Sequence, residues 1–282
     1  MERPAAPTGL RHELGGYREY HPAPALAPFA ESVWVHQAPA IIAAGPLPMH
    51  RVLPDPALNL AFRCRRAADG RPDNPRLVII GPKTRPFIFR FEQGHEIAAV
   101  KLKLEWAEIL LGLVPGEHHD REHDLSLVAP RLATSLLGTL VESRTAGEAV
   151  SSIGAALLQQ ARRSPSEGRS AAAYALDLVR QSRGRLNLDR VATTMGASSR
   201  HLRRSVRREA AISLKAYARI VRLNHAMSAA DRALRPAWAR IAADSGFFDQ
   251  SHLVRECRSL TGQAPSRLFR ERRAQAEISN RA

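Results

Sequence analysis

Cysteine is nearly absent from this sequence, which has only Cys64 and Cys257 among its 282 residues. Two such distant cysteines form neither a disulfide framework nor a Cys-x-x-Cys metal pair, so we expect two ordinary buried thiols. The sequence also lacks any run of about 18 apolar residues, and no membrane-spanning helix is predicted. The segment Met1–Tyr20 has neither the charged start nor the apolar stretch of a signal peptide. We therefore expect a cytoplasmic protein.

Acidic residues are scarce in only one part of the chain. Residues 1–170 hold 20 Lys and Arg against 18 Asp and Glu, whereas residues 171–282 hold 22 against 9. The C-terminal part thus carries nearly all of the net charge of +15. A basic region beside a neutral one predicts a polyanionic partner. Of the 42 basic residues 38 are Arg, which can bind phosphate groups and guanine edges in a bidentate manner.

The first hundred residues predict a β-rich domain. Short apolar segments alternate with Pro and Gly, a pattern typical of strands joined by turns in a β-barrel or sandwich. The predicted strands are Ser32–Gln37, Met49–Leu53, Ala57–Arg63, Arg76–Ile80, Arg85–Phe91 and Ile97–Leu104. The strict alternation of apolar residues and Lys from Val100 to Leu104 predicts that one face of this strand is exposed to water.

Helical spacing of apolar residues follows the predicted strands. The segments Trp106–Gly112, Pro130–Val141 and Ala146–Arg163 are predicted helices, which either cover the β-domain or join two protomers. A polar segment with Pro and Gly then predicts a linker at residues 164–170. We accordingly divide the chain into an N-terminal sensor or dimerisation domain at 1–163, the linker, and a helical domain at 171–282.

A first helix-turn-helix pattern begins at Asn187 or Asp189. Gly196 supplies the tight turn, Ser198 caps the next helix, and Leu202 faces inward. The candidate DNA-binding residues of this unit are Ser198, Ser199, Arg200, Arg203, Arg204 and Arg207. Its four Arg share one helix face and repel one another unless an anion, such as DNA in its major groove, neutralises them. A solvated basic face is the alternative.

A second pattern of the same kind lies about 50 residues further on, and the helix predicted at Ser213–Leu234 would join the two. Gly246 makes its turn, Asp249 caps the following helix, and Leu253 and Cys257 point inward. The candidate DNA-binding residues here are Gln250, Ser251, Val254, Arg255 and Arg258. Gln and Arg pair with adenine and guanine edges, and Val can contact a thymine methyl group. Two such units in a basic domain are a much stronger signal than one.

The segment from Trp238 to Arg270 resembles the signature of AraC/XylS-type transcription regulators. It contains Ile-Ala, Gly-Phe, Ser-His-Leu, Arg, Gly and Pro in the family's order, ending in an aromatic residue and Arg. The first unit matches as well, and the resemblance covers about residues 171–273. It implies a domain of about seven helices with two recognition helices. The base-contacting positions it implies are Arg200, Arg203, Arg204, Gln250, Ser251 and Arg255.

Three residues depart from the family pattern. Val206 and Cys257 stand where the family usually has Phe, and Ala211 stands where it usually has Gly. The first two should cost at most a few kcal/mol of stability by loosening the core, and Ala211 should alter a helix end. The N-terminal part resembles the sensor domain of some such regulators more weakly, through Trp34 and the segment Leu53–Asp55, among other residues.

These observations together predict a two-domain fold, with a cupin-like β-barrel or sandwich carrying appended helices, followed by an all-α domain with two helix-turn-helix units. We predict a sequence-specific transcription regulator, an activator rather than an enzyme, whose partners are double-stranded DNA and RNA polymerase. A small-molecule effector or homodimerisation would control it, and no cofactor is expected. The alternatives are a metal-dependent cupin-like enzyme and a nonspecific architectural DNA-binding protein.

Histidine placement bears on the enzyme alternative. His118, His119 and His123 lie in a segment rich in Gly and charge, which predicts a solvated loop rather than a metal site. No His-Glu-x-x-His order is present, and the predicted strands carry only scattered histidines where a metal would need a cluster. The mixed Gln, Ser, Val and Arg surface of the second recognition helix favours base reading over nonspecific binding.

Overall fold

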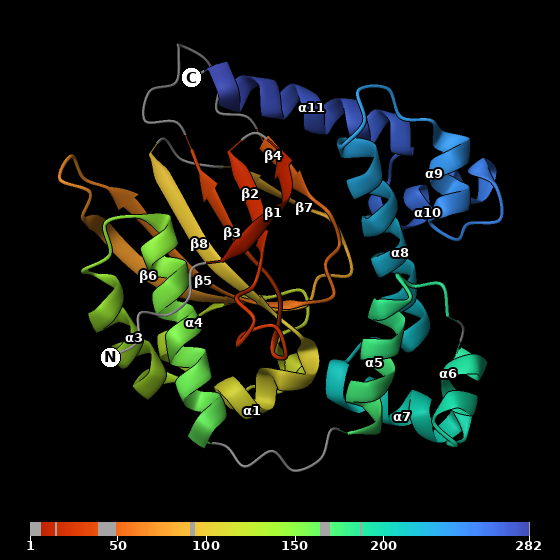
Figure 1. Cartoon of the computed structure of the whole chain (residues 1–282), viewed down its shortest axis with the longest axis horizontal. Helices are drawn as coiled ribbons and strands as arrows, with labels where there is room; N and C mark the ends of the chain where they lie inside the picture. The colour runs from red at the N-terminus through yellow and green to blue at the C-terminus, as the bar shows by residue number, and fades with distance from the viewer. Residues whose placement is uncertain are drawn as a thin grey trace.

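The β-strands and the helix-turn-helix units lie in two parts of the molecule that pack side by side (Figure 1). The computed structural model describes residues 7–14, 16–38, 49–90, 94–163, 170–186 and 188–281. A β-rich N-terminal part with its own helices precedes a C-terminal part made of helices. This confirms the predicted fold class. Within the described residues, no helix is long and apolar enough to cross a membrane.

The N-terminal part is built on an antiparallel sheet with the strand order β1-β2-β3-β8-β5-β6-β9. Its strands are β1 (Thr8–Leu14), β2 (Tyr17–His21), β3 (Ala30–Gln37), β5 (Leu58–Arg66), β6 (Pro72–Ile80), β8 (His95–Leu102) and β9 (Glu122–Asp124). A second sheet pairs β4 (Met49–Val52) with β7 (Phe87–Arg90). Every strand predicted from the sequence overlaps one of these.

The two faces of the larger sheet bury different side chains, as the period-two alternation of a strand requires. One face contributes Val33, Phe62 and Val100 to the main hydrophobic core, together with the appended helices. The opposite face presents Trp34 and Ala99 to a smaller apolar cluster. The appended helices are η1 (Leu104–Trp106), α1 (Ala107–Leu111), η2 (Pro115–His118), α2 (Leu125–Val128), α3 (Pro130–Leu140) and α4 (Ala146–Arg163).

The sequence did not predict β1, β2 and β9. Most residues of β1 are exposed and those of β2 are mainly half-buried, so neither strand carries the apolar alternation that identifies a strand. Strand β9 is only three residues long and lies in the segment that was predicted to be a solvated loop. That prediction is wrong for His118, which is buried and stacks edge-on against His123 with 5.1 Å between ring centroids.

The described residues of the C-terminal part form seven helices, the number that the family resemblance implies. They are α5 (Ala171–Gln181), α6 (Leu188–Thr194), α7 (Ser199–Ala210), α8 (Leu214–Asp231), α9 (Trp238–Asp244), α10 (Gln250–Thr261) and α11 (Pro265–Arg281). Of the predicted linker, residues 164–169 lie outside the described residues. Ser170 caps α5 by accepting a hydrogen bond from the Ala173 amide at 3.0 Å. Both cysteines are buried and free, as predicted.

Candidate functional site

The first helix-turn-helix unit consists of α6, a turn at Gly196 and α7. Gly196 has φ +60°, a left-handed conformation that glycine adopts without strain. The Ser198 hydroxyl accepts the His201 amide at 3.2 Å and so caps α7, as predicted. Asn187, the alternative start predicted for the first helix, lies outside the described residues. The turn therefore fixes where α7 begins and which of its faces is buried.

The outer face of α7 is strongly basic. Leu202 and Val206 are fully buried on its inner face. The four predicted Arg are all exposed on this helix, namely Arg200, Arg203, Arg204 and Arg207. Ser198 is also exposed, whereas Ser199 is half-buried and donates a hydrogen bond to Asp189 at 3.0 Å. The helix thus presents a row of guanidinium groups to the outside with its apolar anchors on the opposite side.

The second unit repeats this construction with α9, Gly246 and α10. Gly246 has φ +79°, and the Asp249 carboxylate accepts the His252 amide at 2.6 Å to cap α10. Leu253 and Cys257 are fully buried beneath the helix. The outward residues Gln250, Ser251, Arg255 and Arg258 are exposed, and Val254 is half-buried. The predicted inner and outer faces are therefore those observed.

Arg222 on α8 holds the second turn in place. Its Nη1 donates to the Gly246 carbonyl oxygen at 3.2 Å, and its guanidinium lies 5.4 Å from the ring centre of the buried Phe247. The next residue, Phe248, is 91% exposed just before the α10 cap. Its backbone amide donates to His252 Nδ1 at 3.3 Å. A large apolar side chain is thereby fixed beside the start of the second recognition helix.

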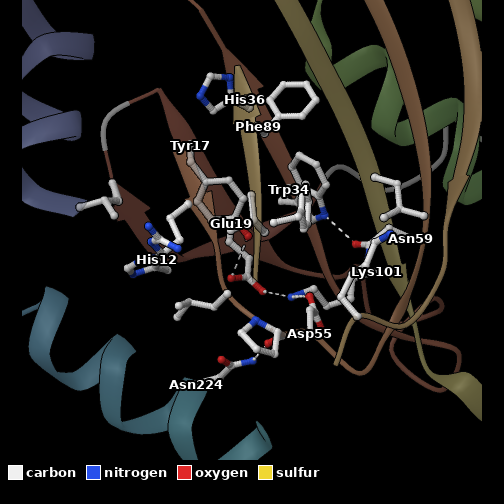
Figure 2. A pocket seen from close by; sticks show the side chains of 18 of the residues that line it. His12, Tyr17, Glu19, Trp34, His36, Asp55, Asn59, Phe89, Lys101 and Asn224 are labelled. Atoms are coloured by element: carbon white, nitrogen blue, oxygen red, sulfur yellow. Dashed lines mark hydrogen bonds and ion pairs between the residues drawn. The ribbon is translucent and has the colours of Figure 1, made fainter. Parts of the chain in front are cut away.

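A pocket of about 260 Å³ lies between the two parts of the molecule (Figure 2). Its walls on the β side include Tyr17, Trp34 and Lys101, which point into it from β2, β3 and β8. On the other side, Asn224 of α8 and Arg272 of α11 complete it. The pocket is thus formed by the β-sheet together with the helix that joins the two helix-turn-helix units.

A largely buried lysine lines this pocket. Lys101 Nζ is 2.8 Å from Asp55 Oδ2 and 3.9 Å from Glu19 Oε1. Burial by itself would lower the pKa of Lys101, but Asp55 and Glu19 together raise it well above its ordinary value. Burial would likewise raise the pKa of Glu19, yet Lys101 and Arg11 lower it to about 2. Lysine and both carboxylates thus form a compact charged group.

This arrangement corrects the expectation for the Val100–Leu104 segment. The alternation does separate two faces, but Lys101 is only 16% exposed and faces the pocket instead of open water. The pocket residues were not assigned from the sequence, because Tyr17, Glu19, Asp55 and Asn224 come from distant segments that only the fold brings together.

Polar contacts attach α8 to the β-rich part along its length. Near its start, the Tyr217 hydroxyl accepts a hydrogen bond from Arg180 at 3.0 Å, and Arg180 also binds Glu105 at 2.6 Å. In the middle, Asn224 Nδ2 donates to the Pro54 carbonyl oxygen at 2.9 Å. At its end, Asp231 lies 3.6 Å from His12 Nε2. The joining helix therefore contacts the N-terminal part directly near its middle and its end, and near its start Arg180 of α5 bridges the two.

The residues that the structure describes contain no group of three or more His, Cys, Asp or Glu side chains arranged to hold a metal ion. His119 Nδ1 lies 3.3 Å from Asp120, while His118 and His123 contact each other. Burial and the neighbouring His123 lower the pKa of His118. These histidines pack η2 against β9.

Two family models match the chain. Residues 191–271 match a helix-turn-helix domain, and residues 18–124 match a domain of unknown function (DUF6597). No curated protein sequence matches the chain significantly. The helix-turn-helix match spans the end of α6 through the start of α11, which includes both recognition helices.

Solved structures of ToxT from Vibrio cholerae are similar to the chain at low identity. An apo lysine-to-alanine variant from strain SCE256 is 11% identical, with a TM-score of 0.46, over 93% of this chain and 99% of that one. ToxT from V. cholerae O395 is 9% identical, with a TM-score of 0.45, over 84% and 96%. Wild-type ToxT bound to an unsaturated fatty acid is 13% identical, with a TM-score of 0.43, over 86% and 96%.

The family match coincides with the part of the chain that carries both capped helix-turn-helix units. Each unit exposes Arg side chains on its second helix and buries the apolar ones, and α10 also exposes the amide of Gln250. The C-terminal part therefore carries a helix-turn-helix domain of the AraC type, and the chain is a DNA-binding transcription regulator.

Proposed function

We propose that α7 and α10 enter successive major grooves on one side of double-stranded DNA. The observation that carries this proposal is the pair of helices joined through α8, of which α7 exposes four Arg and α10 exposes Gln and Arg. Recognition helices that read successive grooves lie about one helical turn, roughly 34 Å, apart. In this arrangement the Arg of α7 bind phosphate groups and guanine, and Gln250 and Arg255 read adenine and guanine edges.

We further propose that the pocket between the two parts receives a small-molecule effector. The support is its position, because any molecule inside it touches both the β-sheet and the joining helix α8. A ligand shifts a conformational equilibrium only through contacts that differ between the states. Contacts with both parts of the molecule provide such a difference, and the effector thereby changes how the two recognition helices are presented to DNA.

We also propose that the bound protein activates transcription by recruiting RNA polymerase. It would do so in the cytoplasm and without catalysing a reaction. Homodimerisation through the N-terminal part is proposed as well. Placing a selected site upstream of a promoter and measuring transcription in vitro establishes the sign of regulation. Light scattering of the purified protein at several concentrations measures its oligomeric state.

Selection from a pool of randomised DNA duplexes tests the DNA-binding proposal. We expect an enriched site with two short sequence blocks whose centres are about 10 base pairs apart. Replacing Arg204 by Ala should relax the sequence preference in one block, and Arg255→Ala in the other, each at a cost of about 1–3 kcal/mol. Affinity should also fall steeply with salt.

Arg131→Ala is the matched control, because Arg131 is exposed on α3 in the N-terminal part. It should leave both blocks and the salt dependence unchanged. The proposal that two helices read the DNA would be contradicted by either of two outcomes. One is a pool without an enriched site, and the other is a site with a single block that both variants weaken equally.

A further inference from the structure

The charged side chains that line the interdomain pocket are largely neutralised by partners within the protein. Lys101 pairs with Asp55 at 2.8 Å, and Arg272 pairs with Asp231 at 2.6 Å. The same holds for two more lining residues, Arg51 with Glu271 at 3.0 Å and Arg63 with Glu122 at 2.9 Å. A charged ligand entering this pocket would lose its hydration and find most counter-charges already engaged.

Much of the remaining lining is aromatic or apolar. Tyr17 and Trp34 lie next to each other with 5.6 Å between ring centroids, and Figure 2 shows both beside Lys101. Phe87, Phe89 and Met227 also line the pocket. Such a surface stabilises a planar apolar body through burial and offset ring contacts.

One hydrogen-bond acceptor in the pocket has no partner among the described residues. The Asn224 side chain donates from Nδ2 to the Pro54 carbonyl oxygen, but its buried Oδ1 accepts no hydrogen bond there. A buried acceptor without a partner is destabilising. A ligand N–H or O–H group near α8 would satisfy it.

We propose that this pocket takes a neutral aromatic ligand that carries an amide or hydroxyl donor and discriminates against the corresponding carboxylate. The inference rests on the proposed function, in which the pocket receives the effector. The donor group of the ligand binds Asn224, and its ring packs on Tyr17 and Trp34. Because Asn224 belongs to α8, the ligand is sensed directly by the helix that joins the two recognition units.

Lys83 is the lining cation without an ion pair among the described residues. Its Nζ lies 5.5 Å from the ring centre of Phe87, and burial lowers its pKa despite the nearby Asp120 and Glu122. If the pocket were an anion site, Lys83 would therefore be the group that binds a carboxylate. In that event a Lys83→Met variant would lose affinity for the carboxylate.

Isothermal titration calorimetry on the full chain without DNA tests this proposal with three probes of nearly equal shape. These are biphenyl carboxamide, which is neutral, biphenyl carboxylate and biphenyl carboxamidine. We expect the amide to bind at least about tenfold more tightly than either charged probe, a difference of about 1.4 kcal/mol. Since no DNA is present, the result is independent of the selection experiment on α7 and α10.

Two variants should change the preference in opposite directions. Lys101→Met leaves Asp55 and Glu19 without their shared cation, so the amidine should become the tightest probe. Asp55→Asn removes one of those carboxylates, so the carboxylate probe should gain. Lys215→Met, at an exposed position on α8, is the matched control and should keep the wild-type order. Circular dichroism identifies folded variants, and Asp55→Asn suffices if Lys101→Met does not fold.

Two results would overturn the proposal. The first is a carboxylate that binds wild-type protein most tightly and loses its affinity in Lys83→Met. The second is the absence of measurable heat with all three probes while the protein still selects its DNA site.

Discussion

The two helix-turn-helix units share one design but differ in what they expose. Each has a left-handed glycine in its turn and an oxygen-bearing side chain that caps the second helix. On α7 the outward residues are mainly Arg, whereas α10 mixes Gln, Ser, Val and Arg. Arg-rich surfaces supply affinity for phosphate, and mixed surfaces distinguish bases. We therefore propose that the first unit contributes more to affinity for DNA and the second more to sequence specificity.

The units also differ in how they are attached to the N-terminal part. The first is attached through Arg180 of α5, which contacts Glu31, Glu105 and Tyr217. Burial alone would lower the pKa of Arg180, but these three neighbours raise it, so its charge is permanent. The second unit is attached near His12, whose charge depends on pH. The first attachment therefore keeps its charge, whereas the second includes a titratable histidine in addition to the ion pair of Arg51 with Glu271.

Of the changes to these attachments, removing Arg180 should lower the free energy of unfolding most. Arg180→Met leaves the buried carboxylate of Glu105 and the half-buried one of Glu31 without their cation, and a buried ion pair that loses one partner costs about 3–5 kcal/mol. We expect a large loss in the free energy of unfolding, measured by chemical denaturation. Hydrogen exchange should increase in α5 and α7 more than in α10.

Arg131→Met on the exposed face of α3 serves as the control and should change stability by less than about 0.5 kcal/mol. If Arg180→Met were as mild as this control, or if α10 opened as much as α7, the separate attachment of the two units would be wrong.

Lowering the pH should act on the second attachment. Burial lowers the pKa of His12 below 6.5, and Arg272 adds to this effect although Asp231 opposes it. The unfolded chain then binds the proton more readily than the folded one. Stability present above pH 6.5 is therefore lost as the pH falls below that value, by at most about 1.4 kcal/mol per pH unit for one group.

Thermal unfolding between pH 7.5 and 5.5 measures this loss, and His12→Gln should flatten the profile. His225 and His118 also have lowered pKa values, mainly through burial. The slope that remains in His12→Gln belongs to such groups. A profile unchanged by the substitution would exclude His12 as a pH-sensitive part of the attachment.

The local chemistry of the recognition helices could be predicted from the sequence because it depends on nearby residues. Ser198 and Asp249 cap their helices through amides three residues away, and the apolar spacing identifies the buried faces. The pocket could not be predicted, because Glu19 and Lys101 meet only through the strand order β2-β3-β8. The contact between Arg180 and Glu105 likewise depends on how two distant parts pack.

The smallest change in stability is expected from substitutions at the C-terminal ends of the two recognition helices. Ala211 ends α7 at φ +53°, whereas Gly262 ends α10 at φ +77°. The left-handed conformation costs a residue with a side chain about 1–2 kcal/mol, partly offset by the greater freedom of Gly in the unfolded chain. Ala211→Gly should therefore stabilise the protein by about 0.5–1 kcal/mol. Gly262→Ala should destabilise it by a similar amount. A Cβ at Gly262 meets nothing within 4 Å, so backbone strain alone determines the effect of that substitution. Chemical denaturation of both variants measures these opposite shifts. Equal signs would show that the contact between α7 and η2, where a Cβ on Gly116 would lie 3.0 Å from the Ala211 Cβ, outweighs the backbone strain.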